Sequence, residues 1–147
     1  YTRPDQYDQV RANPEMWENV FTEMMRYDPV VHMQFRRATE DIALYEEVIP
    51  KGGNVIIYLG AGNRDERVFE RPDDFIIDRD NVRKHLSFGF GIHRCMGNRL
   101  AEMQLRLVWE EIVKRFERVE VVGEPVRVQS SFVKGYAELP VRLHPLS

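Results

Sequence analysis

The sequence contains one cysteine among its 147 residues. A single cysteine excludes an internal disulfide and any cysteine-rich zinc or iron–sulfur cage, and it is typical of a reducing compartment, so we expect a cytoplasmic location. No apolar run is long enough to span a bilayer. The net charge of −3 comes from interspersed acids and bases, so no field of one sign is present to attract nucleic acid or an anionic membrane.

The composition is that of a globular domain, because 43% hydrophobic residues are enough to form a core. The chain begins with Tyr1 rather than Met, and no repeat, low-complexity tract or interdomain linker divides it. We therefore expect residues 1–147 to form one unit of mixed α and β structure.

The first third of the chain predicts two helices, a short one over residues 5–12 and a longer one that starts at Asn13. Asn13 can cap the second helix, and the residue before Pro29 disfavours its continuation. Its apolar face has helical spacing and consists of Trp17, Val20, Phe21 and Met24.

The middle of the chain predicts strands over residues 33–39, 42–45 and 55–59. The last of these is a continuous apolar run, which is typical of a strand buried on both faces. Residues 60–86 predict a short helix followed by an ordered, irregular loop.

The last third predicts a helix over residues 98–116, followed by a hairpin of strands within 119–128 and 132–143. The helix carries a wide apolar stripe, so we expect much of it to be buried.

The segment from Phe88 to Gly97 surrounds Cys95 with glycine-rich backbone. Gly89, Gly91 and Gly97 permit conformations that a β-carbon would forbid. The helix that follows directs unpaired N–H groups and the positive end of its dipole toward the sulfur. These features suit a metal-bound thiolate, whereas a small buried hydrophobic residue is the usual role of an isolated cysteine.

A second motif, Glu23-Met24-Met25-Arg26, places an acid and a base three residues apart on the longer of the first two helices. Both residues lie off the apolar stripe. Periodicity by itself therefore favours an exposed ion pair.

In this order, the two motifs resemble those of the cytochrome P450 family, the haem-thiolate monooxygenases. The resemblance runs from Pro4 to Leu143 and implies the carboxyl-terminal part of that fold: the Glu-x-x-Arg helix, a small β-sheet, the meander, the cysteine-ligand loop, the long proximal helix and a terminal β-hairpin. It implies that residues 1–147 are a fragment of a single P450 domain, inactive alone and binding haem poorly or not at all.

In this family the Glu-x-x-Arg pair is buried and helps to lock the cysteine loop to the core. An arginine that often joins the pair is replaced here by Asp74, so the resemblance leaves Arg71 and Arg79 as alternatives for its place.

The resemblance also implies a site for haem b, iron protoporphyrin IX. Cys95 would be the proximal iron ligand and the catalytic residue. His93 and Arg36 would each face a haem propionate, a surface or structural role being the alternative for His93. Phe88 would pack over the sulfur side of the haem, and N–H groups near Gly97 would hydrogen-bond the sulfur.

Four further residues occupy segments that commonly reach the substrate pocket in this family: Val31, His32, Phe132 and Val133. Their alternative role is simple core packing.

The resemblance implies an oxidoreductase that inserts one oxygen atom from O₂ into its substrate. Residues 85–102 look like those of soluble bacterial alkane and fatty-acid terminal hydroxylases, which implies a small aliphatic substrate. Electrons would come from a [2Fe–2S] ferredoxin and its NAD(P)H-dependent reductase. Arg94 and Arg99 would attract an acidic ferredoxin.

Three other classes of protein stay open. A haem-thiolate isomerase or peroxide-using protein would share every motif. A cysteine-nucleophile enzyme would use His93 or His85 as its base, although His93 lies only two residues from Cys95 on a tight loop. A structural module without haem leaves the joint occurrence of the two motifs unexplained.

Overall fold

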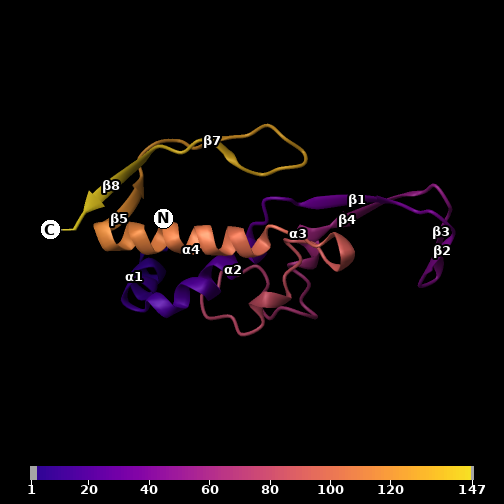
Figure 1. The fold of residues 1–147 in the computed structure, drawn as a ribbon, viewed down its shortest axis with the longest axis horizontal. Coiled ribbons are helices and arrows are strands. Elements are labelled where there is room, and N and C mark those ends of the chain that lie inside the picture. The colour runs from indigo at the N-terminus through magenta and orange to yellow at the C-terminus, as the bar shows by residue number, and fades with distance from the viewer. Residues whose placement is uncertain (1–2, 147) are drawn as a thin grey trace.

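The computed structural model of the chain describes residues 3–146, in which three short helices, one long helix and four two-stranded ribbons form an elongated molecule (Figure 1). The helices are α1 (Pro4–Ala12), α2 (Trp17–Tyr27), α3 (Leu59–Gly62) and α4 (Asn98–Arg115), with 3-10 turns at Pro14–Met16, Val82–Lys84 and Gly91–His93. The strands are β1 (Met33–Arg37), β2 (Ile42–Leu44), β3 (Glu47–Ile49), β4 (Asn54–Tyr58), β5 (Phe116–Val121), β6 (Val126–Arg127), β7 (Tyr136–Glu138) and β8 (Val141–Pro145). Within these residues no helix is both long and apolar enough to cross a membrane.

The core lies where α2 packs against α1, α4 and the loop that carries Ile77. Trp17 stacks between Phe21 and Trp109, with ring centroids 5.7 and 5.6 Å away. The predicted apolar face of α2 is confirmed at its first three positions, but Met24 is 40% exposed. Polar residues from the opposite side of this helix are buried in its place.

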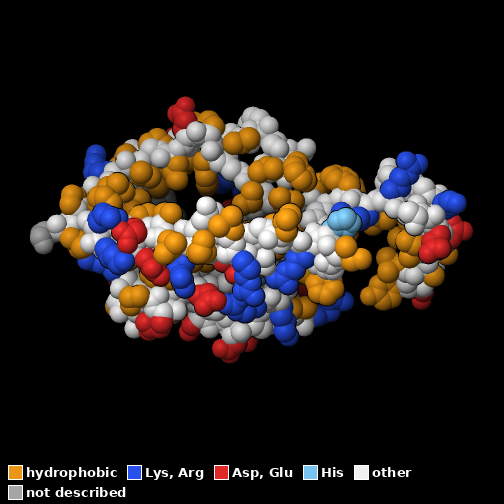
Figure 2. Space-filling model, viewed as in Figure 1, with side chains coloured by type: hydrophobic (Ala, Val, Ile, Leu, Met, Phe, Trp, Pro, Cys, Tyr) orange, Lys and Arg blue, Asp and Glu red, His pale blue; other side chains and the backbone are white. Residues whose placement is uncertain are grey.

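Each sheet consists of two antiparallel strands: β1 with β4, β2 with β3, β5 with β8, and β6 with β7. The ribbon of β1 and β4 projects away from the helices and ends in the β2–β3 hairpin (Figure 1). The prediction that residues 55–59 are buried on both faces is wrong, since Ile56 is 45% exposed. A two-stranded ribbon covers neither face of its own strands, and apolar side chains gather visibly on the projecting part (Figure 2).

The predicted burial of the long helix is also wrong, because no residue of α4 is buried. Only Trp109 and Val113 pack against the core, whereas Leu100 and Val108 are more than half exposed. Among the described elements, α2 is the only helix in extensive contact with α4. The apolar stripe is therefore present, but most of it has no cover within residues 3–146.

The carboxyl-terminal segment returns along α4 as a long ribbon, as the predicted hairpin requires (Figure 1). Strand β5 begins at Phe116, directly after α4, and pairs with β8. The turn between β6 and β7 lies near the start of β1, where Val31 and Val133 form an isolated antiparallel bridge. The mixed α and β fold class is confirmed.

Candidate functional site

The loop around Cys95 is closed by its own backbone. The Cys95 N–H donates to the Phe88 carbonyl at 2.8 Å, and the Arg94 N–H donates to the Gly91 carbonyl at 3.0 Å. Gly89 and Gly91 have φ angles of +72° and +76°, a region that L side chains rarely adopt. The predicted need for glycine is therefore confirmed at these two positions.

Gly97 behaves differently from the other two glycines. It directly precedes α4 with φ at −89°, a conformation open to any residue, so the predicted backbone requirement at this position is wrong. A β-carbon built there would lie 3.8 Å from Cys95 Sγ, which places residue 97 beside the sulfur. In the described part of the chain, none of the hydrogen bonds found reaches Sγ.

A cavity of about 660 Å³ lies beside Cys95, bordered by α4, the end of α2 and the loop between β6 and β7. Figure 2 shows hydrophobic side chains around a hollow between α4 and the terminal ribbon. The cavity is lined by Met25, Val30, Val31, Gln34, Ser87, Phe88, His93, Cys95, Ala101, Gln104, Leu105, Val108 and Phe132. Five of the predicted site residues thus meet at one cavity: Cys95, His93, Phe88, Val31 and Phe132.

Arg36 lies outside the cavity wall but is joined to it through Gln34. Arg36 Nη2 donates to Gln34 Oε1 at 3.1 Å, and Arg36 Nη1 donates to the Phe35 carbonyl at 2.8 Å. Gln34 also faces the cysteine loop, since a β-carbon at Gly89 would lie 3.3 Å from Gln34 Nε2. The sequence reasoning missed Gln34, although strand alternation places it on the same face as Arg36.

His32 and Val133 do not line this cavity, so their place at the substrate pocket stays a prediction. The His32 ring turns toward α3, where a β-carbon at Gly60 would lie 3.2 Å from Nδ1. Val133 contributes backbone pairing to Val31 rather than a lining side chain. Alternation along an extended segment accounts for Val133, whose neighbour Phe132 lines the cavity, but not for His32, because Val30 and Val31 both line it.

Glu23 and Arg26 are completely buried, so periodicity was wrong to favour an exposed ion pair. Arg26 Nε and Nη2 donate to the two Glu23 carboxylate oxygens at 2.7 and 2.8 Å. The rest of the guanidinium donates to the carbonyls of Asn63, Pro72 and Asp74 at 2.8 to 3.0 Å. These carbonyls accept the hydrogen bonds that water would accept from an exposed guanidinium, so Arg26 can be buried although helical periodicity predicts exposure.

Arg79, not Arg71, completes this pair. Arg79 Nε lies 3.2 Å from both carboxylate oxygens of Glu23, and its Nη atoms donate to the carbonyls of residues 70, 71 and 74. Arg71 instead forms an exposed ion pair with Asp74. One buried carboxylate therefore holds two arginines, each of which also fastens the irregular loop.

Asn63 and Ser87 connect this buried network to the cysteine loop. Asn63 Nδ2 donates to the Arg26 carbonyl and to Ser87 Oγ, and Asn63 Oδ1 accepts from the Leu86 N–H at 2.6 Å. Ser87 Oγ donates to the Met25 carbonyl at 2.5 Å. The chain that enters the cysteine loop is thereby bonded directly to α2. The sequence reasoning assigned neither residue a role, because neither side chain follows a hydrophobic period.

His85 lies two residues before Ser87 and is uncharged at neutral pH. Burial lowers the pKa of His85 from 6.5 to about 4, and the positive charges of Arg94 and Arg83 act in the same direction. Its Nδ1 accepts a hydrogen bond from the Ser87 N–H at 3.1 Å. Because that nitrogen already has a donor, His85 is poorly suited to act as a base for a cysteine nucleophile.

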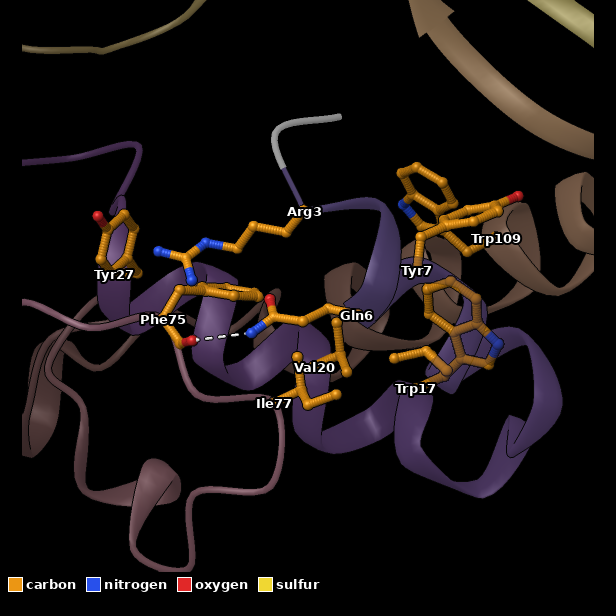
Figure 3. Close-up of a pocket in the computed structure, with 10 residues that line it drawn as sticks. Arg3, Gln6, Tyr7, Trp17, Val20, Tyr27, Phe75, Ile77 and Trp109 are labelled. Carbon is orange, nitrogen blue, oxygen red and sulfur yellow. Dashed lines mark hydrogen bonds between the residues drawn. The ribbon is translucent and has the colours of Figure 1, made fainter.

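A second cavity, of about 320 Å³, lies along α1 and α2 (Figure 3). Its walls include Tyr7, Trp17 and Trp109, and the Gln6 amide nitrogen donates to the Phe75 carbonyl at 3.3 Å. None of the predicted site residues lines this cavity. Cys95 therefore identifies the larger cavity as the candidate site.

The larger cavity has the donor set that a haem needs. Among residues 3–146 no group of three or more His, Cys, Asp or Glu side chains is placed to hold a metal ion. Cys95 lies on the cavity wall and would be the residue that holds the haem iron. A thiolate is a known axial ligand of haem iron. The walls are largely apolar, and Arg36, Gln34 and His93 supply polar groups near the rim that suit carboxylates.

Comparison with known proteins agrees with this geometry. The family model described as "Cytochrome P450" matches residues 3–135. Linalool 8-monooxygenase of Pseudomonas putida is 42% identical over 97% of this chain and 35% of its own length. The solved structure of cytochrome P450-153 from Novosphingobium aromaticivorans is 44% identical with a TM-score of 0.92, over 97% of this chain and 36% of that chain.

A similar match exists to CYP153D17 from a Sphingomonas species, which is 45% identical with a TM-score of 0.88 over 95% of this chain and 35% of that chain. The chain thus spans about a third of the length of the relatives it matches. The family model nevertheless covers most of the chain, and its matched range of residues 3–135 contains both the Glu23–Arg26 pair and the Cys95 loop. The chain belongs to the cytochrome P450 family, whose members bind haem b.

Proposed function

We propose that this chain is the carboxyl-terminal portion of a single-domain cytochrome P450 monooxygenase and that it supplies the proximal side of the haem site. One observation carries the proposal: Cys95 lies on a glycine-shaped loop at the wall of a 660 Å³ cavity. Two others support it. The chain matches only about a third of its relatives, and the apolar residues of α4 and of the β1–β4 ribbon are exposed.

Each site residue has a separate task in this proposal. Haem b, when bound, supplies the activation of O₂ and the transfer of one oxygen atom. Cys95 binds the iron through its sulfur, and Phe88 shields that sulfur from water. Arg36, held by Gln34, and His93 bind the propionates.

The buried network positions this ligand rather than taking part in chemistry. Glu23, Arg26 and Arg79 fasten the irregular loop to α2, and Asn63 joins the same network to residues 86 and 87. The first residue of the cysteine loop, Phe88, follows immediately. The sulfur is therefore held at one end of a rigid, fully bonded structure.

We propose a small aliphatic substrate that is hydroxylated at its end, such as an alkane or a fatty acid. The apolar side chains of Val31 and Phe132 on the cavity wall suit such a molecule. A further support is the 42% identity to a protein named for its action on linalool.

The proposed electron donor is a [2Fe–2S] ferredoxin with its NAD(P)H-dependent reductase, in the cytoplasm. Arg94 is exposed directly beside Cys95, and the Arg99 side chain is exposed on the first turn of α4. These two cations suit an acidic partner at the sulfur side of the site. Reversal of both charges should slow electron transfer, and an unchanged rate would count against this partner.

The test of the proposed activity uses the full-length protein with O₂, ferredoxin, reductase and NADPH. Dodecane and dodecanoic acid should yield terminal alcohols, and the Cys95→Ser variant should yield none. A complete enzyme that oxidises no linear aliphatic would overturn the proposed substrate. Residues 1–147 alone should be inactive and bind haem poorly, so a stable stoichiometric haem complex of this chain would contradict the proposed fragment.

A further inference from the structure

Two segments far apart in the sequence are joined at the edge of the Cys95 cavity. One follows α2 and comprises residues 28–31, and the other is the loop of residues 130–135 between β6 and β7. Val31 and Val133 pair as an antiparallel bridge, and the Lys134 N–H donates to the Val30 carbonyl at 2.8 Å. Val30, Val31 and Phe132 from these segments all line the cavity.

An ion pair between Lys134 Nζ and Asp28 Oδ1 links the same two segments. Asp28 is the residue at the carboxyl end of α2, where the negative end of the helix dipole disfavours a carboxylate. A cation at that position removes the penalty. Lys134 therefore neutralises the Asp28 carboxylate, which is unfavourable at the end of α2. This attraction favours contact between residues 28–31 and the loop of residues 130–135.

The loop transmits this anchoring to Phe132. Ser130 Oγ accepts hydrogen bonds from the N–H groups of Phe132 and Val133, both at 3.1 Å, which holds residues 130–133 in a tight turn. Phe132 is thus fixed between its own turn and the anchored residue 134. The side chain is half-exposed and faces the cavity, so its position depends on where the loop is held.

We propose that Asp28 and Lys134 form a positioning pair that holds the 130–135 loop against the end of α2 and thereby places Phe132 at the wall of the cavity. Neither residue lines the cavity. The pair therefore acts through Phe132 and Val31, and it sets how well an apolar, chain-like ligand is retained. This last statement rests on the proposed function.

The first test measures hydrogen exchange of the Lys134 amide in the full-length protein, with or without haem. The variants are Asp28→Asn, Lys134→Met and the exchange of charges Asp28→Lys with Lys134→Asp. Each single variant should exchange about threefold to fivefold faster, as expected for one partly exposed ion pair. The charge exchange should return the rate to within about twofold of wild type. Glu111→Gln, which removes an exposed carboxylate from the ion pairs of α4, is the matched control and should change nothing.

The second test measures the Kd for dodecanoic acid in the same proteins by equilibrium dialysis. In the active enzyme, KM and kcat for the same substrate are measured separately. Single variants should raise Kd and KM about threefold with kcat nearly unchanged, and the charge exchange should restore both, since an exposed pair is worth well under one tenfold step. A merely structural role would not give this separation of KM from kcat with rescue by the reversed pair.

The outcomes separate the two claims. Unchanged amide exchange in both single variants would overturn the positioning pair whatever the protein catalyses. Faster exchange with unchanged dodecanoic acid binding would show that the pair holds the loop without shaping the cavity, which also overturns the proposal. A wild-type protein without a haem-thiolate spectrum would overturn the proposed function, while the amide exchange would still decide whether the pair holds the loop.

Discussion

The buried Glu23–Arg26 network and the Cys95 loop are connected through Asn63 and Ser87, but they differ in exposure and in bonding. Glu23 and Arg26 are 0% exposed, and their charged groups are bonded to partners within the chain. Cys95 is exposed beside Ile92 and Met96, which are 100% exposed. The network is complete within residues 3–146, whereas the cysteine loop presents its sulfur to a cavity.

This difference separates stability from chemistry. A charge buried among fixed partners is costly to disturb, because removal of one partner leaves the others unpaired and out of water. An exposed thiol contributes little to packing, so its replacement should alter ligand binding and leave the fold intact. Substitutions in the buried network should therefore lower the stability of the fold, whereas replacement of Cys95 should change ligand binding and leave stability nearly unchanged.

The largest effect on stability should come from Glu23→Gln, which leaves Arg26 and Arg79 buried around a neutral amide. We expect the free energy of unfolding of the full-length protein to fall by about 3–5 kcal/mol, measured by urea denaturation. Glu111→Gln on the surface of α4 is the control and should cost less than about 0.5 kcal/mol. If the two variants unfold at the same urea concentration, the network does not stabilise the fold.

A smaller loss should follow Asn63→Ala, which strips the link between the network and the cysteine loop. The substitution leaves the Leu86 N–H and Ser87 Oγ without their bonds to this side chain. We expect a loss of about 2 kcal/mol in the same urea experiment, together with faster hydrogen exchange at residues 86–88. Protection of those amides at the wild-type level would show that the loop is held by other contacts.

The pH dependence of stability should report the environment of His85. Its pKa is about 4 in the folded protein, below the ordinary value of 6.5, so the unfolded chain takes up the proton first as the pH falls. Stability should therefore be lost as the pH falls from about 6.5 to about 4 and should level off below that range. His85→Asn, which keeps an acceptor for the Ser87 N–H, should remove this part of the slope in thermal unfolding from pH 7 to 4. An unchanged slope would refute the assignment.

The smallest effect on stability should come from Cys95→Ser, on the other side of the comparison. Because the thiol is exposed, we expect the free energy of unfolding of the haem-free protein to change by less than about 0.5 kcal/mol. Urea denaturation of that form measures it. A loss comparable to that of Asn63→Ala would mean that the sulfur is a packing group.

Local patterns predicted the fold class and the cysteine loop, because glycine at positive φ and helical spacing are properties of short segments. They misjudged Glu23 and Arg26, since a helical period cannot reveal carbonyls that arrive from residues 63–79. They also gave the wrong burial for β4 and α4. An apolar stripe shows that a face favours contact with other apolar groups, but not whether residues of this chain make that contact. The Asp28–Lys134 pair joins positions 106 residues apart and has no local signal.

The most direct test of the central claim is the carbon monoxide difference spectrum of the reduced full-length protein, recorded for wild type and for Cys95→Ser. Coordination of haem iron by the Cys95 thiolate predicts a strongly red-shifted Soret band in wild type that is lost in the variant. A wild-type spectrum typical of imidazole coordination, or a red-shifted band that survives in Cys95→Ser, would contradict it.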